Sequence, residues 1–512
     1  MKIRPIAAIF VIILSTVLAC NTVADLGWPT ASATSTTQPS RTPVPEDPIA
    51  TLGEPTPTFD PPPNPNPGAE GIGDPYFESL GNGGYEVQHY HLILDVDVEL
   101  NEIAAVAAID AVATQPLSSL NLEFIGLDIE GITVDGDEAL FQRQRGELTI
   151  FLPEPAATGD ALQITIRYHG TPGEGVSGAM PQYSEGWIYY GDGIMVAGEP
   201  TGASTWYPVN EHPADKATYS FAITVEDPYM AAANGILTEV ADIGGRSTYH
   251  WEMDDPIAPY LVTVGIADFD VEEYIGPSGV PIRNYFGAGV TQAVRDDFAL
   301  QGDMIAYFED IFGPFPFDAY GVVVHDLELG FALETATMAV FGDAFTAEFV
   351  VAHELAHMWF GDAVGLKSWQ DIWLNEGFAS YAEELWNEHA YGREVMDEKI
   401  RGYYEYGAQF GQFFGDAPIG DPGPDNLFSK VVYVRGALTL HALRLEVGEV
   451  AFFDILQTYY GRYNGGNAST ADFIAVAEEV SGQDLDAFFD GWLYQTELPD
   501  IPQMDLFAAD FQ

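Results

Sequence analysis

Two histidines and two glutamates have the types and the spacing of a metal site with its own base. An H-E-x-x-H motif at residues 353–357 is followed, after eighteen intervening residues, by Glu376. Residues four apart on a helix lie one turn apart on the same face, so both imidazoles can bind one ion. A Glu from a second element would complete the His, His, Glu ligand set of catalytic zinc sites. We expect one Zn²⁺ per chain, held by His353, His357 and Glu376, with Glu354 placed to take a proton from bound water.

Two helices are needed to bring these side chains together. Residues 347–360 are strongly apolar and contain no Gly or Pro, which predicts a buried helix that ends at Gly361. Residues 369–386 predict a second helix, which carries Glu376. Its one breaker is Gly377, which costs about 1 kcal/mol relative to Ala and indicates close packing at that point. Asn375 and Glu383 on this helix are candidates to support the metal ligands by hydrogen bonds.

The charge balance excludes one class of partner. The chain has 512 residues, of which 47% are hydrophobic, and its formal net charge is −60 from 78 acidic and 18 basic residues. The hydrophobic content is enough for a sizeable core in two or three domains. A negative field repels phosphate backbones, so we expect no nucleic-acid binding. Most of the acidic residues are expected to solvate the surface.

The N-terminus has the pattern of an export signal. Lys2 and Arg4 precede an apolar run at residues 6–19, which is too short to span a bilayer comfortably and has the length of a signal-peptide core. Residues 17–20 resemble the lipobox of bacterial lipoproteins, and Cys20 is the sole cysteine. We expect residues 1–20 to be a signal peptide and Cys20 to carry a lipid anchor to the membrane. The protein would then be extracytoplasmic, in the bacterial cell envelope; the alternatives are plain secretion or an uncleaved anchor.

Composition and periodicity divide the rest of the chain into three parts. Residues 21–75 are rich in Pro, Thr and Ser, which predicts a disordered linker. Residues 76–275 alternate apolar and polar side chains with period two, as in Leu92, Leu94 and Val96, which predicts a β domain. Residues 276–512 have mainly helical patterns, with strand-like runs at 320–325 and 330–334 and a helix start at 469–472.

Six stretches together resemble the aminopeptidase N family of zinc metallopeptidases. They are residues 353–357, 373–379, 330–335, 198–201 with 206–208, 432–437 and 488–493. The resemblance covers roughly residues 80–500. It implies an α+β multidomain fold, in which an N-terminal antiparallel β domain precedes a thermolysin-like, mostly helical zinc catalytic domain.

The resemblance also implies roles for residues outside the metal motif. Glu334 and Glu199 would bind the free amine of a peptide substrate by charge-assisted hydrogen bonds. Gly330 and Ala332 would bind the substrate along the strand edge at 330–334. Tyr433 would stabilise the oxyanion that forms from the scissile carbonyl.

Three features of the chain depart from the family or carry no role in it. Leu333 and Thr335 stand where the family has Met and Asn, which changes the subsite beside Glu334. The chain stops soon after residue 492, where many relatives continue into a helical domain over the active site, so we expect no such cover. His441 is expected to be a hydrogen-bonded core residue, and His325, in a strand-like run near the site, is given no role.

These residues leave three functions open. The first is a zinc aminopeptidase that removes N-terminal residues from peptides with a free N-terminus. The second is a zinc endopeptidase, or an epoxide-hydrolase-like relative, that uses the same ligands. The third is a non-catalytic envelope lipoprotein that binds peptides. Glu334 and Glu199 favour the first, because an endopeptidase has no use for acids beside the first substrate residue.

Overall fold

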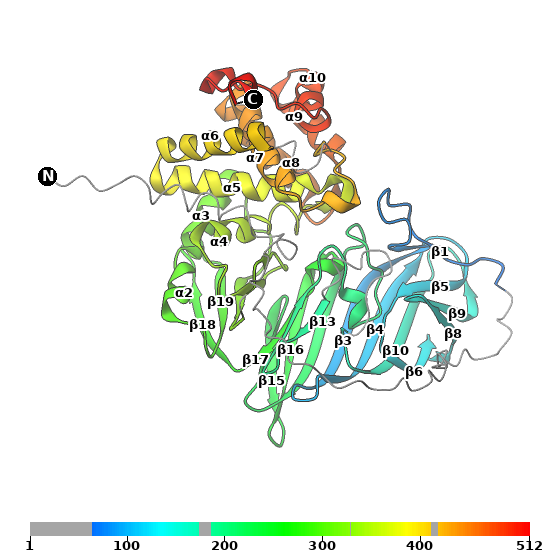
Figure 1. The fold of residues 1–512 in the computed structure, drawn as a ribbon. Helices are drawn as coiled ribbons and strands as arrows, with labels where there is room; N and C mark the ends of the chain where they lie inside the picture. The colour runs from blue at the N-terminus through cyan, green and yellow to red at the C-terminus, as the bar shows by residue number, and fades with distance from the viewer. Residues whose placement is uncertain (1–63, 174–185, 328, 411–417, 512) are drawn as a thin grey trace, which may run out of the picture.

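The computed structural model describes residues 64–173, 186–327, 329–410 and 418–511. The predicted signal peptide, with Cys20, and most of the predicted linker lie outside these residues. Figure 1 shows a β-rich part, coloured blue to green, below a set of helices coloured yellow to red. No helix of the described residues is long and apolar enough to cross a membrane.

The largest sheet is built from the N-terminal half of the chain. Its strands are β3 (Tyr85–Asp97), β4 (Glu102–Ala113), β6 (Asp128–Val134), β7 (Asp137–Glu138), β10 (Ala161–Gly170), β13 (Ala217–Glu226), β15 (Ile236–Asp242) and β16 (Arg246–Ile257). They lie in the order β15-β16-β13-β3-β4-β10-β6-β7. Leu92, Leu94 and Val96 are fully buried, which confirms the predicted alternation.

One strand pair departs from the predicted antiparallel arrangement. The strands β13 and β3 run parallel, whereas the other neighbours in this sheet are antiparallel. Sequential hairpins produce antiparallel neighbours, but β13 is reached through a long connection that follows β10. The predicted antiparallel arrangement therefore holds for this sheet except at this pair.

Two smaller sheets and a short hairpin complete the N-terminal β part. Their strands are β5 (Leu117–Glu123), β9 (Glu147–Ala156) and β8 (Leu140–Gln144) in one sheet, β11 (Gly186–Tyr189), β12 (Ile194–Ala197), β17 (Val264–Ala267) and β14 (Met230–Ala233) in the other, and β1 (Ala69–Glu70) with β2 (Asn82–Gly83) in the hairpin.

The strand β1 lies inside the predicted linker, which therefore extends too far. Asp74 is 4% exposed, accepts hydrogen bonds from the backbone of Tyr76 and Phe77, and lies 3.2 Å from the imidazole of His212. The contact with His212, which is 138 residues away, cannot be inferred from local composition.

A five-stranded sheet underlies the helices. It contains β18 (Phe269–Ile275), β19 (Pro281–Gly287), β20 (Tyr320–His325), β22 (Ala339–Gly342) and β21 (Ala332–Leu333), in that order across the sheet. The predicted strand-like runs at 320–325 and 330–334 correspond to β20 and β21, and β21 is the edge strand beside β22. The sheet begins at β18, before the domain boundary predicted at residue 276.

The helices follow one another along the rest of the chain. They are α2 (Gln292–Asp297), α3 (Gln301–Phe312), α4 (Glu348–Ala356), α5 (Trp373–Tyr391), α6 (Arg393–Phe410), α7 (Lys430–Val447), α8 (Glu449–Tyr463), α9 (Thr470–Ser481) and α10 (Asp486–Phe489), with a minor strand pair β23 (Gly365–Leu366) and β24 (Asn467–Ala468). The helix α9 begins with the predicted cap, in which Ser469 and Asp472 form a capping box.

Two glycines allow α5 and α7 to cross at very short range. A Cβ atom added to Gly436 would lie 2.5 Å from the Cα atom of Gly377, and one added to Gly377 would lie 2.8 Å from the Cα atom of Gly436. Side chains cannot fit at this distance, so the close packing predicted at Gly377 is confirmed. The crossing fixes α7 against the helix that carries Glu376.

Arg435, beside this crossing, ties α7 to the C-terminal segment. Its buried guanidinium donates hydrogen bonds to five backbone carbonyls, those of Gly491, Trp492, Gln495, Thr496 and Glu497. Nε and Nη1 each donate to one of these carbonyls, and the two N–H groups of Nη2 are shared among the other three.

Candidate metal centre and substrate-binding site

The histidines of the motif lie at the end of α4. The helix is shorter than predicted, because it ends at Ala356 and residues 357–359 form a turn that leads to Gly361. His357 is the C-cap residue and still has helical dihedral angles, and its backbone N–H bonds to the carbonyl of His353. The two imidazole rings therefore remain one turn apart, with centroids separated by 4.8 Å.

Glu376 on α5 faces both imidazoles. Its Oε2 atom lies 3.3 Å from Nε2 of His353 and 3.7 Å from Nε2 of His357. One ligand atom from each of these three side chains falls within a group that is 4.8 Å across, and all three residues are buried. The structure thus brings the predicted ligand set together.

The other ring nitrogen of each histidine is held by the protein. Nδ1 of His353 lies 2.7 Å from Glu383, and Nδ1 of His357 lies 3.1 Å from the backbone carbonyl of Phe360. These contacts hold the rings with both Nε2 atoms toward Glu376, as in zinc sites whose histidines donate their second N–H to a carboxylate or carbonyl. Two neutral nitrogens and one carboxylate at this separation fit Zn²⁺. Glu383 supports a ligand as predicted, whereas the Asn375 amide bonds to the Tyr260 hydroxyl at 3.2 Å.

Glu354 is buried beside the ligands. One of its oxygens belongs to a second group, with Glu334 and His357, whose atoms also lie within 4.8 Å of one another. Burial raises the pKa of Glu354 to about 8, His353 opposes this shift, and Glu376 adds to it. The carboxylate is therefore in reach of any molecule bound between the metal ligands and Glu334.

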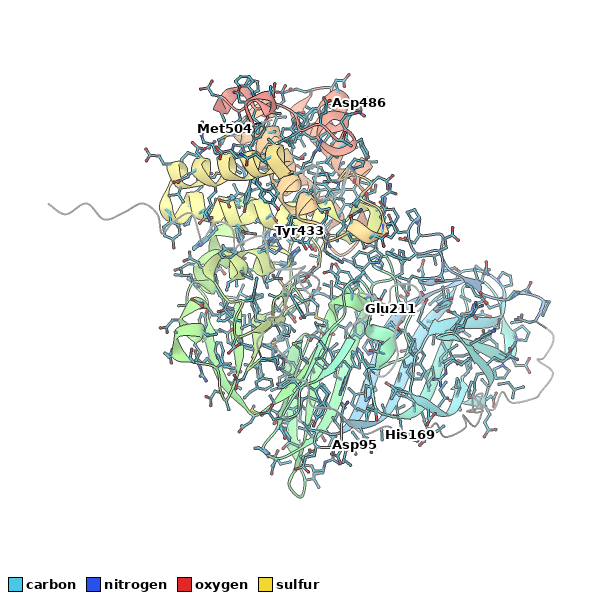
Figure 2. The ribbon with its side chains drawn as sticks, in the orientation of Figure 1. Asp95, His169, Glu211, Tyr433, Asp486 and Met504 are labelled. Carbon is cyan, nitrogen blue, oxygen red and sulfur yellow. The ribbon has the colours of Figure 1, made fainter. Side chains whose placement is uncertain are left out.

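Tyr433 approaches the same place from α7. Its ring is stacked on the imidazole of His353, with centroids 6.0 Å apart and an angle of 19° between the planes. Figure 2 shows Tyr433 on the underside of the helices, where they meet the rest of the molecule. The residue as a whole is half-buried, whereas its hydroxyl oxygen is buried.

Two further carboxyl groups lie beside Glu376. Glu334 directly follows β21 and is 2% exposed, and Glu199 follows β12 in the N-terminal β part. One oxygen from each lies within 4.8 Å of the other and of Glu376. One oxygen of each is buried without a hydrogen-bonding partner. Such carboxylates favour a bound cation.

The pKa shifts of Glu334 and Glu199 also favour a bound cation. Burial raises the pKa of Glu334 well above its usual range, and Glu376 and Glu354 raise it further. Burial and then Glu334 do the same for Glu199. A positive charge between these carboxylates would relieve both the desolvation and the repulsion.

The edge strand β21 borders these groups. Gly330 is exposed and has open space around its Cα atom, whereas Ala332 is 3% exposed. The sheet order leaves the outer edge of β21 without a neighbouring strand among the described residues. An extended peptide could add there by backbone hydrogen bonds.

The histidines to which no role was given lie in the core. His325 and His441 are fully buried, and each is hydrogen-bonded to a tyrosine hydroxyl, that of Tyr190 and that of Tyr381. Sequence reasoning missed Asp362, a fully buried carboxyl whose pKa is raised by burial and then by Glu334. Its position just after the metal-binding turn was the available signal.

Comparison with known proteins places this geometry in a family. Residues 304–492 match the Peptidase family M1 domain, and residues 86–261 match the Peptidase M1 N-terminal domain. A substituted form of the M1 zinc metallopeptidase from Deinococcus radiodurans is 30% identical, with a TM-score of 0.78; the alignment covers 84% of this chain and 99% of that one. The chain belongs to the M1 family of peptidases. Its two-part architecture, β-rich and then helical, is that of the M1 fold.

Curated relatives in the M1 family are longer. Endoplasmic reticulum aminopeptidase 1 of Homo sapiens is 26% identical over 445 residues, which are 77% of this chain and 46% of that protein. Aminopeptidase N of Lactococcus lactis is 26% identical over 449 residues, which are 80% of this chain and 51% of that protein. The chain thus spans about half the length of the curated relatives it matches.

Proposed function

We propose that this chain is a zinc-dependent aminopeptidase that removes the N-terminal residue from peptides. One observation carries the proposal: carboxylate oxygens of Glu199 and Glu334 lie within 4.8 Å of each other and of the metal ligand Glu376. Only a short piece of substrate fits between a scissile carbonyl at the metal and a cation at these acids. A protonated α-amine one residue from the scissile bond has that length and charge.

Each side chain of the site has a separate role in the proposed hydrolysis. His353, His357 and Glu376 would hold zinc, which when bound polarises the scissile carbonyl and lowers the pKa of a water molecule. Glu354 takes a proton from that water and delivers it to the leaving amine. The Tyr433 hydroxyl donates a hydrogen bond to the carbonyl oxygen as negative charge develops there.

Substrate binding relies on the peptide backbone. Glu334 and Glu199 hold the ammonium group, while Gly330 and Ala332 offer the edge of β21 to the extended chain. In support, the enzyme from Deinococcus radiodurans has been crystallised as a variant with a Tyr-Ser-Ala substrate. Short peptides with a free N-terminus are therefore the substrates we assign to this chain.

A pair of substrates that differ only at the amine tests the proposal. Hydrolysis of an aminoacyl reporter should fall roughly tenfold or more when its amine is acetylated, because acetylation removes at least one charged hydrogen bond. Glu354→Gln should keep zinc and lose turnover by about 10²–10⁴-fold, which shows that the measured activity belongs to this site. Internal cleavage of acetylated peptides at the rate of free ones would identify an endopeptidase instead.

We propose further that the protein is anchored in the bacterial cell envelope by a lipid on Cys20. The support is the sequence of residues 1–20, in which the sole cysteine of the chain follows a signal-peptide core. Cys20→Ser should release the protein from the membrane fraction or leave it uncleaved. A wild-type protein that fractionates as freely soluble would refute the anchor.

A further inference from the structure

The segment that follows Glu334 is a tight and strained turn. The hydroxyl of Thr335 donates to the carbonyl of Met338, whose N–H returns a bond to the carbonyl of Thr335. Thr337 has a φ of 64°, in the left-handed region that β-branched residues rarely adopt. A conformation of this kind is disfavoured and persists only where the surroundings impose it.

Most of the contacts that impose it come from the N-terminal β part, although the N–H of Thr337 also donates to Sδ of Met358 at 3.4 Å. Asn234, which is fully buried, donates from its amide nitrogen to the carbonyl of Ala336 at 2.7 Å and to the carbonyl of Leu261 at 2.9 Å. The N–H of Gly235 donates to the hydroxyl of Thr337 at 2.8 Å. The N–H of Ala336 completes the junction with a bond of 3.2 Å to the carbonyl of Leu261.

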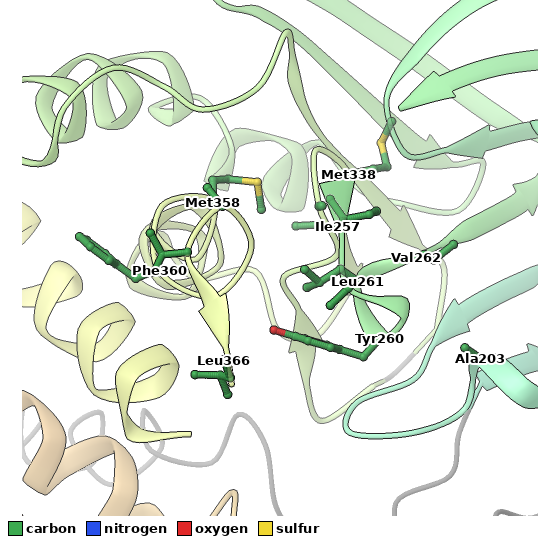
Figure 3. Packing of buried hydrophobic residues seen from close by; sticks show 14 of the residues in the cluster. Ala203, Ile257, Tyr260, Leu261, Val262, Met338, Met358, Phe360 and Leu366 are labelled. Atoms are coloured by element: carbon green, nitrogen blue, oxygen red, sulfur yellow. The ribbon is translucent and has the colours of Figure 1, made fainter. Parts of the chain in front are cut away.

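The same region of the N-terminal β part also touches the metal side of the site. Leu261 lies in the 3-10 turn Pro259–Leu261, and the hydroxyl of its neighbour Tyr260 accepts from Asn375 and donates to the carbonyl of Gly361. Figure 3 shows this turn facing the segment that holds Phe360 and Leu366, with the Tyr260 hydroxyl directed toward it. Residues 234–235 and 259–261, taken together, therefore contact both the turn after Glu334 and the elements that carry the predicted metal ligands.

We propose that Asn234 is a positioning residue that fixes the distance between Glu334 and the metal ligands, and that the N-terminal β part thereby helps to set where a peptide is cut. The proposal rests on the proposed aminopeptidase function. Asn234 touches neither the substrate nor the metal ligands. It acts through the turn, because its amide holds Ala336 and Leu261 in register while Gly235 holds Thr337.

Loss of the junction should release the strain in the turn. Without the Asn234 amide, the buried carbonyl of Ala336 loses a donor, while that of Leu261 keeps the N–H of Ala336, so the turn is less firmly held. Without its hydroxyl, Thr337 loses the bond from Gly235, which is one of the contacts that hold it in the left-handed region. Glu334 lies three residues before Thr337, so its carboxylate would shift relative to the metal and weaken the bond to the substrate amine.

The test measures amine recognition in the full-length zinc enzyme. We expect Asn234→Ala to raise KM for a free aminoacyl reporter about tenfold, as for one weakened charged bond, with kcat within about twofold of wild type. The ratio of rates for the free and acetylated reporters should fall by the same factor, and zinc content should stay at one ion per chain. Thr337→Val, which keeps the β-branched shape and removes the hydroxyl, should have the same effect, and Thr337→Ser should restore wild-type values.

A buried asparagine elsewhere provides the matched control. Asn210 is 3% exposed, and its side chain accepts from the N–H of Asn82 at 2.5 Å and donates to the carbonyl of Asn82 at 3.3 Å. Asn210→Ala should lower the melting temperature without changing KM or the free-to-acetylated ratio. If Asn234→Ala is unstable, the pair Thr337→Val and Thr337→Ser decides the question.

The outcomes separate this inference from the function on which it rests. If wild type distinguishes the two reporters and the Asn234 and Thr337 variants do so equally well, the positioning role is wrong and the aminopeptidase function stands. A fall in rate that is equal for free and acetylated reporters would also refute the role. If wild type does not distinguish them, the proposed function fails and the positioning role fails with it.

Discussion

The helix crossing at Gly436 gives a prediction whose size can be worked out from the structure. Gly to Ala in the interior of a helix normally stabilises it by about 1 kcal/mol. In Gly436→Ala, however, the new methyl group would lie 2.5 Å from the Cα atom of Gly377, about 1 Å short of ordinary carbon–carbon contact. Overpacking of this kind costs about 1–3 kcal/mol, so we expect net destabilisation.

The same displacement should affect catalysis. Gly377 follows the ligand Glu376 on α5, and Tyr433 lies one turn before Gly436 on α7. If the helices separate by about 1 Å, Tyr433 moves away from its position beside His353. A misplacement of that size can cost up to about 10²-fold in rate, so kcat should fall by roughly 10- to 100-fold with little change in zinc content.

Two other helical glycines are matched controls for the measurement. A Cβ atom added to Gly402 in α6 or to Gly461 in α8 would meet nothing within 4 Å. Gly402→Ala and Gly461→Ala should leave kcat unchanged and raise the melting temperature slightly, while Gly436→Ala lowers both quantities. Thermal unfolding and steady-state kinetics on all three variants are sufficient. A Gly436→Ala protein as stable and active as the controls would refute the close crossing.

Three further predictions concern single side chains. Glu376→Ala should lose or weaken zinc binding in metal analysis of the dialysed protein; full retention with normal turnover would remove this residue from the ligand set. Tyr433→Phe should keep zinc and KM but lower kcat by roughly 10²–10³-fold, and a wild-type rate would exclude the oxyanion role. The third concerns the pKa of Asp472. Partial burial of this carboxyl raises its pKa, but hydrogen bonds from Lys367 and Ser469 outweigh burial and lower the pKa to about 2. Its contribution to stability is therefore present above about pH 4 and lost as the pH falls toward 2, so the urea midpoints of wild type and Asp472→Asn should converge as the pH is lowered from about 4 to 2.

Features set by neighbouring residues in the chain could be predicted from the sequence. The spacing of His353 and His357 places two imidazoles on one helical face whatever surrounds the helix. Alternation at Leu92 and Leu94 likewise predicts a strand with one buried face. The capping box at the start of α9 needs only residues 469–472.

Features that join distant segments could not be predicted in this way. Asn234 and Ala336 are 102 residues apart, and Tyr260 and Asn375 are 115 apart. The sequence around Asn234 and Tyr260 does not distinguish these residues from ordinary buried Asn and Tyr residues. The parallel pairing of β13 with β3 also depends on the path of the chain between strands rather than on either strand. Resemblance to a family supplied Glu199 and Glu334, which local patterns alone would have left as surface residues.

The bonds of Arg435 bear on how this protein can be shortened for laboratory use. The matched M1 domain ends at residue 492, which makes that position a tempting place to stop a recombinant chain. Three of the five carbonyls that Arg435 binds, those of Gln495, Thr496 and Glu497, lie beyond it. A chain cut at 492 would leave a buried guanidinium short of acceptors on the helix that carries Tyr433. Such a product is expected to aggregate or lose activity. A chain that keeps residues 493–497 and the residues that follow them should do neither.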